Sequence, residues 1–150
     1  MADSMNAQIR RADERDLPSI LAIEERSFVT AWTDDFFRHE LRNPISRFYI
    51  LQNEAQIIGY IIIWMVADES HIANLAVHPE FRSAGLGGKL LNFAFEIARR
   101  NGAKTITLEV NEHNNAARRL YQKYQFALTG RRARYYENRD DALILTRSLE

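Results

Sequence analysis

The feature that most constrains the fold is the apolar run IIGYIIIWMV, which extends from Ile57 to Val66. It is much shorter than the about 20 apolar residues that a helix needs to cross a bilayer. The run is rich in Ile, and the polar turn residues ADES follow it, which is typical of a long strand buried in a sheet. We therefore expect a central sheet that other elements cover on both faces.

The composition indicates one globular domain rather than a disordered chain. The chain has 150 residues, 46% of them hydrophobic, and we expect a single domain over residues 1–150. Its 20 Lys and Arg balance its 20 Asp and Glu, whereas general nucleic-acid-binding proteins carry a basic excess. There is no Cys, which excludes disulfides, thiolate metal sites and a Cys nucleophile. The polar N-terminal segment lacks a signal-peptide pattern, so we expect a cytoplasmic protein without membrane or nucleic-acid partners.

Hydrophobic periodicity predicts a mixed α/β fold with helices on both sides of the sheet. Helix starts are marked by Asp16, by Thr33 or Asp34, and by Asn114, whose side chains suit the N-cap position. The expected strands are residues 8–12, 47–51, 57–66, 71–77, 104–110, 127–135 and 142–148, and the expected helices are residues 16–28, 33–43, 87–101 and 114–124.

The segment HPEFRSAGLGGKLL joins a strand that ends at Val77 to a helix that starts near Gly87. A helix start carries free N–H groups and a partial positive charge, and glycines let a phosphate approach the backbone. Arg82 adds a cation with a fork of donors. The segment therefore favours a phosphate or pyrophosphate site over a flexible glycine loop. Lys89 is followed by Leu90, which excludes both the Walker loop and the dinucleotide fingerprint.

The pattern Arg82-x-x-Gly85-x-Gly87 resembles the acetyl-CoA signature Q/R-x-x-G-x-G/A of the GNAT superfamily of N-acetyltransferases. The expected element order is similar over nearly the whole chain. The resemblance implies a mostly antiparallel seven-stranded sheet that is splayed at a bulge, with acetyl-CoA as co-substrate. Main chain before the loop would bind pantetheine, and the loop would bind pyrophosphate. The residues assigned to acetyl-CoA are Leu75, Ala76, Val77, Arg82, Ser83, Ala84, Gly85, Leu86, Gly87, Gly88, Asn114 and Tyr121.

Three further motifs, AWTDDFF, LEVNEHNNAARRLYQKYQF and RARYYENRDDALIL, are similar to the RimI-type branch, the ribosomal-protein-alanine N-acetyltransferases. Trp32, Glu109, Asn114, Tyr121 and the pair Tyr135-Tyr136 fall on the places of this branch's motifs.

The chain departs from the branch at three positions. Gly88 stands where Arg or Lys is usual, Asn111 where Arg is usual, and Gln125 where Gly is usual. The last position suits a left-handed helix end, at which a residue other than Gly costs about 1 kcal/mol.

Acetyl transfer requires a neutral amine. At pH 7 about one in ten α-amino groups is neutral, against about one in a few thousand lysines. Acetylation of an N-terminus therefore depends less on a general base than acetylation of a lysine does. The candidate base is Glu109, acting directly or through water, because it lies on the face of its strand opposite Ile106, Leu108 and Val110. The alternation of β-strand residues alone fits an ordinary exposed carboxylate at Glu109 equally well. The match to the Leu-Glu-Val motif of the family favours the role of general base.

The remaining candidate site residues are aromatic or main-chain groups. Tyr121 is the candidate acid for the CoA thiolate, although its place on the inner stripe of a helix also fits core packing. Asn114 suits a helix cap, a CoA contact or both. A main-chain N–H at Val77 would stabilise the oxyanion. Trp32, Tyr135 and Tyr136 would line a peptide cleft or serve as ordinary core and strand aromatics.

The other polar clusters carry no assigned chemistry. The histidines, namely His39, His71, His78 and His113, lack metal-binding spacing and are interpreted as surface or loop residues, so no metal is expected. The segment GRRAR is interpreted as a solvated strand edge, with an acidic-substrate or ribosomal docking patch as the alternative.

The sequence thus predicts an acetyl-CoA-dependent N-acetyltransferase that acts on protein N-termini by direct transfer, as a monomer or weak dimer. By resemblance, the acceptor is the N-terminal Ala of a small-subunit ribosomal protein. The alternatives are a small amine or an internal lysine as acceptor, or an acyl-CoA-binding module without turnover.

Overall fold

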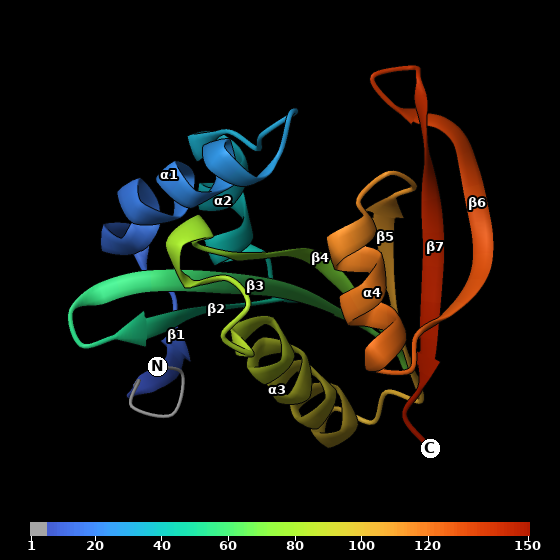
Figure 1. The fold of residues 1–150 in the computed structure, drawn as a ribbon. Coiled ribbons are helices and arrows are strands. Elements are labelled where there is room, and N and C mark those ends of the chain that lie inside the picture. The colour runs from blue at the N-terminus through green and yellow to red at the C-terminus, as the bar shows by residue number, and fades with distance from the viewer. Residues whose placement is uncertain (1–5) are drawn as a thin grey trace.

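The computed structural model describes residues 6–150 and is built on one seven-stranded sheet with the order β1-β2-β3-β4-β5-β7-β6 (Figure 1). Neighbouring strands are antiparallel except β4 and β5, which are parallel. The strands are β1 (Ala7–Arg11), β2 (Ser46–Asn53), β3 (Gln56–Val66), β4 (Glu69–Val77), β5 (Thr105–Asn111), β6 (Ala127–Tyr136) and β7 (Asp140–Ser148). The helices are α1 (Leu17–Ser27), α2 (Asp34–Arg42), α3 (Leu86–Arg100) and α4 (Asn115–Lys123), with short 3-10 turns at Glu14–Asp16 and Pro79–Phe81.

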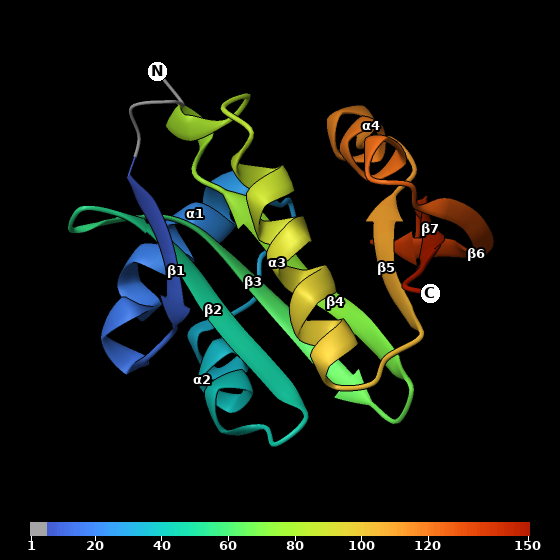
Figure 2. The ribbon, with the colours of Figure 1, turned by 90° about the horizontal axis from the view of Figure 1, so that it is seen from below.

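Helices cover both faces of the sheet, as the apolar run on β3 predicts. Figure 2 shows α3 on one side of strands β2 to β4 and the pair α1 and α2 on the other. On β3, Ile61 and Ile63 belong to the core under α3, whereas Tyr60 and Ile62 belong to the core under α1 and α2. All four side chains are fully buried. The predicted mixed fold with a mostly antiparallel sheet is confirmed.

The sheet opens between β4 and β5, and this opening places the candidate site. Along the β3–β4 ladder Ile62 pairs with Asn74 but Ile63 pairs with Ile72, which leaves Ala73 as an extra residue on β4. The parallel ladder between β4 and β5 ends in the same place, with the pair Ile72 and Leu108. Beyond it β5 continues along β7 alone. The splay at a bulge that the family resemblance implies is therefore present.

Two of the predicted helix caps are confirmed by hydrogen bonds. Thr33 Oγ1 accepts from the Phe36 N–H at 3.3 Å, and Asn114 Oδ1 accepts from the Ala117 N–H at 3.2 Å. Asp16 precedes α1 as predicted but makes no side-chain cap. Its carboxylate accepts from both Arg10 Nη atoms, at 2.8 and 2.9 Å, so its oxygens are already committed to β1.

Helix α4 ends in a left-handed turn at Gln125, whose φ is 69°. The Phe126 N–H bonds to the Tyr121 carbonyl at 3.0 Å and the Gln125 N–H to the Gln122 carbonyl at 3.0 Å, the pattern of a Schellman cap. Phe126 is buried against the rings of Tyr121 and Phe95. The predicted left-handed position is confirmed, and it is occupied by a residue with a Cβ.

In residues 6–150, no helix combines the length and the apolar composition that crossing a membrane requires.

Replacing Gln125 with Gly should stabilise the protein. Gly adopts a positive φ without the Cβ penalty, so we expect the free energy of unfolding to rise by about 1 kcal/mol. Urea denaturation measures the change. The matched control is Gln122→Gly, an exposed position inside α4, where Gly should lower the free energy of unfolding by about 1 kcal/mol. Equal effects at the two positions would contradict the left-handed conformation.

Candidate active site

Glu109 lies at the point where β4 and β5 part, as the first residue of β5 beyond the last pair with β4. Its side chain is 19% exposed and lies on the face of β5 opposite the α3 core. Oε2 is buried with no hydrogen-bond partner, and Oε1 is 3.7 Å from Nη2 of Arg132. A buried acceptor without a donor costs about 1–3 kcal/mol. The carboxylate therefore keeps an acceptor free for an incoming amine or water.

One tyrosine from another element lies near this carboxylate, and a second tyrosine lies near the first. Burial, and then the charge of Glu109, raises the pKa of Tyr136 at the end of β6 to about 12. Burial, and then the neighbouring Tyr136, raises the pKa of Tyr121 on α4 to about 12. Both phenols are therefore protonated at neutral pH. Within residues 6–150 the Tyr121 hydroxyl has no hydrogen bond, although its side chain is only 7% exposed, so its proton is free to be donated.

Two site residues were not anticipated from the sequence. Arg132 lies on the edge strand β6 with a side chain that is 56% exposed, which agrees with the predicted solvated strand edge, but its guanidinium also lies 3.7 Å from Oε1 of Glu109 and 5.4 Å from the centre of the Tyr135 ring. His71 was interpreted as a surface or loop residue, which is wrong. It lies half-buried on β4 and stacks on Trp64 at 5.6 Å.

Burial lowers the pKa of His71, the charge of Glu109 raises it, and Arg132 lowers it. The three groups are therefore close enough to influence one another. The parallel ladder pairs His71 with Thr107, which lies on the same face of β5 as Glu109. Only that register brings His71 beside Glu109, and no local pattern in the sequence predicts the register between β4 and β5.

The main chain of β4 is free on the side that β5 has left. The His78 N–H bonds to the Ile58 carbonyl of β3 at 2.7 Å, and successive N–H groups of a strand alternate in direction. The N–H of Val77 therefore points away from β3, into the opening. By the same alternation the main-chain groups of Leu75 also face the opening, whereas those of Ala76 face Tyr60 on β3.

The glycine loop leads into the start of α3. Gly85 has a φ of 79° and is the N-cap of α3, without a side-chain cap bond. The loop residues Ser83 and Ala84 and the first helical residue Leu86 flank it. Arg82 was expected to offer its fork to a phosphate, but Nε donates to the Val77 carbonyl at 3.0 Å and Nη2 to Ser27 Oγ at 2.9 Å. The guanidinium thus ties the loop to β4 and to the end of α1.

Gly87 and Gly88 lie where α3 approaches α4. A Cβ on Gly88 would be 1.8 Å from the Tyr124 hydroxyl, and a Cβ on Gly87 would be 3.0 Å from Leu120. Close helix packing therefore accounts for Gly88, the residue that replaces the Arg or Lys usual in RimI-type chains. Asn114, at the other end of this helix pair, acts as the N-cap of α4.

The aromatic residues assigned to a peptide cleft lie on two segments that meet. The ring of Trp32, in the α1–α2 loop, packs on Phe37 at 5.4 Å. The rings of Tyr135 and Tyr136 pack on each other at 5.0 Å at the end of β6. Thr30 Oγ1 donates to Glu137 Oε1 at 3.1 Å and so joins the α1–α2 loop to the β6–β7 turn.

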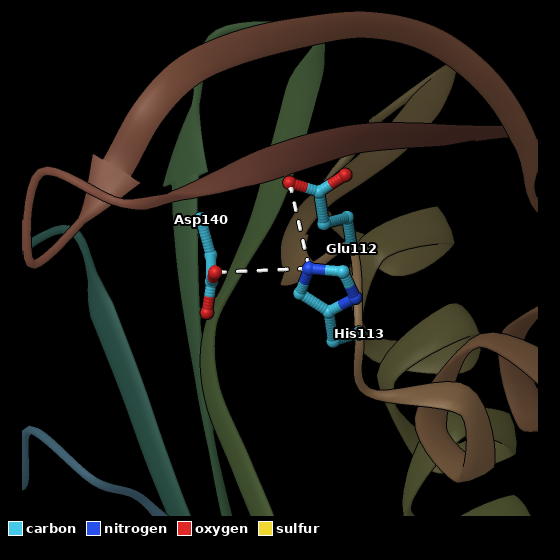
Figure 3. A group of neighbouring side chains, drawn as sticks. All are labelled: Glu112, His113 and Asp140. Atoms are coloured by element: carbon cyan, nitrogen blue, oxygen red, sulfur yellow. Dashed lines mark ion pairs between the residues drawn. The ribbon is translucent and has the colours of Figure 1, made fainter.

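Figure 3 shows a cluster of Glu112, His113 and Asp140, the one group in residues 6–150 with ligand atoms close enough to hold a metal ion. His113 Nε2 is 4.0 Å from Glu112 Oε2 and 3.7 Å from Asp140 Oδ1. Glu112 is already engaged, since Oε2 accepts from the Asp141 N–H at 2.7 Å and Oε1 from Arg131 at 3.3 Å. These bonds fasten the β5–α4 loop to β7 and to Arg131 on β6.

The chain is similar to known acetyltransferases over most of its length. The family model for the acetyltransferase (GNAT) family matches residues 17–126. A Bacillus subtilis protein, provisionally named a ribosomal protein bS18-alanine N-acetyltransferase, is 36% identical over 141 residues, 93% of each chain. The Escherichia coli ribosomal protein bS18-alanine N-acetyltransferase is 31% identical over 140 residues, 91% of this chain and 94% of that one.

Two solved acetyltransferase structures are also similar to this chain over most of its length. The crystal structure of the Escherichia coli ribosomal-protein-S18-alanine N-acetyltransferase superposes with a TM-score of 0.88 and 28% identity, covering 96% of this chain and 94% of that one. A chain of the NatC complex bound to Gag peptide and CoA superposes with a TM-score of 0.85 and 25% identity, covering 97% and 100%.

The charges around His71 give a test of the site geometry. Replacing Glu109 with Gln removes a nearby negative charge and should lower the pKa of His71. Replacing Arg132 with Gln removes a nearby positive charge and should raise it. NMR titration of the His71 ring protons measures both shifts, with the exposed His39 as internal reference. A His71 pKa that is the same in the wild type and both variants would contradict the contact.

The contact between Gly88 and Tyr124 can be tested by a double-mutant cycle. Gly88→Ala forces the Tyr124 ring off α3, whereas the shorter side chain of Tyr124→Leu leaves room for the new methyl group. We expect a coupling free energy of about 1 kcal/mol between the two substitutions, measured by urea denaturation. Additive effects would show that the ring does not fill the space above Gly88.

Proposed function

Because the chain belongs to the acetyltransferase (GNAT) family, we propose that it transfers the acetyl group of acetyl-CoA to the N-terminal α-amine of a protein. The proposed acceptor is the N-terminal alanine of a small-subunit ribosomal protein, the acceptor named for its Bacillus subtilis and Escherichia coli relatives. The observation that carries the proposal is the unpartnered Oε2 of Glu109 at the opening between β4 and β5.

The proposed acetyl-CoA site runs from the free edge of β4 to the start of α3. Acetyl-CoA supplies the thioester, whose carbonyl carbon accepts the amine. Leu75 and Val77 would offer main-chain groups to the pantetheine arm, and Ala76, whose main chain faces β3, lies between them. The loop from Arg82 to Gly88, with the uncapped N–H groups of α3, would bind the pyrophosphate. The Val77 N–H would stabilise the negative charge that develops on the thioester oxygen.

Proton transfer is assigned to the two groups with free hydrogen-bonding capacity. Glu109 takes the proton from the attacking amine, directly or through one water. Tyr121, which is protonated at neutral pH, gives its proton to the departing sulfur. The new N–C bond forms as the C–S bond breaks, so no acyl-enzyme is needed. Arg132 faces the carboxylate at 3.7 Å and balances its charge before the acceptor arrives.

An α-amine suits this site better than a lysine. Its pKa of about 7.7–8.0 leaves about one amine in ten neutral at pH 7, so a single carboxylate with an adjacent cation is a sufficient base. Trp32, Tyr135 and Tyr136 would line the cleft for the first acceptor residues. The bridge from Thr30 to Glu137 would close that cleft on one side.

The test uses a peptide with a free N-terminal Ala and one internal Lys, incubated with acetyl-CoA and analysed by tandem mass spectrometry. We expect acetylation of the α-amine alone and none on a matched peptide with a blocked N-terminus. Glu109→Gln should lower kcat by about 10²–10⁴-fold. Glu96→Gln, an exposed carboxylate on α3, should leave kcat unchanged.

Other outcomes would assign a different function. Acetylation of Lys alone would replace the proposed acceptor with a lysine. Stabilisation by acetyl-CoA with no acetylation of either amine would favour a small-amine acceptor or a binding module without turnover.

A further inference from the structure

Glu24 is a buried carboxylate that takes no part in the proposed proton transfers. It lies in the last turn of α1 and is 1% exposed. Within residues 6–150 it forms no ion pair. An unpaired buried charge is costly, and a negative charge at a helix C-terminus is unfavourable. The other buried residues on this face of α1 are the apolar Leu17, Ile20 and Ile23. A carboxylate here is unfavourable for two reasons, since it lies on an apolar helix face and at the negative end of the helix. Such local conflicts are typical of functional positions.

Three donors stabilise the carboxylate. Asn74 Nδ2 donates to Oε1 at 2.8 Å, and the Tyr60 hydroxyl donates to the same oxygen. The main-chain N–H of Trp32 donates to Oε2 at 2.9 Å, and it is the one donor found on that oxygen within residues 6–150. Burial and the charge of Glu24 raise the pKa of Tyr60, so its hydroxyl remains a donor.

These donors come from the two sides of the proposed site. Asn74 directly follows Ala73, the extra residue of β4, at the point where the sheet opens. Trp32 lies in the α1–α2 loop, which Thr30 joins to the β6–β7 turn. One carboxylate therefore fastens the loop beside the acceptor cleft to the strand that carries the free main-chain edge. Oε1 makes the connection to β4 through Asn74, and Oε2 makes the connection to the α1–α2 loop through Trp32.

We propose that Glu24 is a positioning residue for the acceptor. Oε2 holds the main chain of Trp32, and so keeps the α1–α2 loop in the conformation that binds the acceptor's N-terminus. The inference rests on the proposed function, because it takes the α1–α2 loop to line the acceptor cleft. It adds to that function a residue that touches neither substrate and acts through Trp32.

The near-isosteric variant Glu24→Gln separates the two connections. An amide has one oxygen, which remains best placed where Oε1 accepts from Asn74 and Tyr60. Its NH2 group then faces the Trp32 N–H, so a donor meets a donor and that hydrogen bond is lost. The variant should release the loop and retain the contact with β4.

The experiment compares the wild type, Glu24→Gln and Asp16→Asn with the Ala-initiated peptide as acceptor. Asp16 is a matched control, because it is also a buried carboxylate, but it pairs with Arg10 at the opposite end of α1. We expect Glu24→Gln to raise the peptide KM about tenfold, a change of about 1.4 kcal/mol in binding. Its kcat and its KM for acetyl-CoA should change less than about twofold, and Asp16→Asn should match the wild type.

Amide hydrogen exchange at Trp32, followed by NMR, gives a readout that does not depend on turnover. Exchange should be faster in Glu24→Gln and unchanged in Asp16→Asn. Equal Trp32 exchange in Glu24→Gln and the wild type would overturn the positioning role, as would an unchanged peptide KM. Equal losses in both variants would reduce Glu24 to a stabilising residue. If the wild type acetylates no α-amine while Glu24→Gln still loses Trp32 protection, the proposed function fails and the loop contact stands.

Discussion

Strand β4 carries one residue more than β3 opposite it, Ala73, and beyond that point β5 no longer pairs with it. A sheet normally satisfies every internal N–H and C=O group, so this opening leaves main-chain groups of β4 free in the middle of the molecule. The other parts of the site are arranged around it. Glu109 is the first residue of β5 past the opening, and Asn74 is the first residue of β4 past the bulge.

The helices support this opening from both faces. On one face, α3 begins beside the end of β4, and glycines at its start allow α4 to approach closely. That approach carries Tyr121 to the site from a different element than Glu109. On the other face, α1 places a carboxylate under the bulge, and the α1–α2 loop is hydrogen-bonded to it. The opening is thus supported by packing on the face that α3 and α4 cover and by hydrogen bonds on the face that α1 covers.

Several polar groups in this region lack the partners that buried groups normally have. Oε2 of Glu109 and the Tyr121 hydroxyl are without hydrogen bonds among the described residues, and the carboxylate of Glu24 is without a cation. Elsewhere, buried Asp16 is paired with Arg10, and Glu112 is fully engaged with Arg131 and Asp141. Unpartnered buried atoms also occur elsewhere, at Ser46 Oγ and Arg147 Nε, but within residues 6–150 Oε2 of Glu109 is the one carboxylate oxygen of this kind, and a free carboxylate oxygen is what a general base requires.

The sequence by itself determined the elements, two of the three expected helix caps, the buried strand β3 and the face of β5 on which Glu109 lies, because these depend on alternation and on neighbours within a few residues. It also placed the left-handed turn at Gln125, through a family pattern. The tertiary structure alone decided the parallel register that puts His71 near Glu109, the approach of Arg132, the donors around Glu24 and the ring that occupies the space above Gly88. Those contacts join residues far apart in the chain, and no local pattern encodes which of them meet.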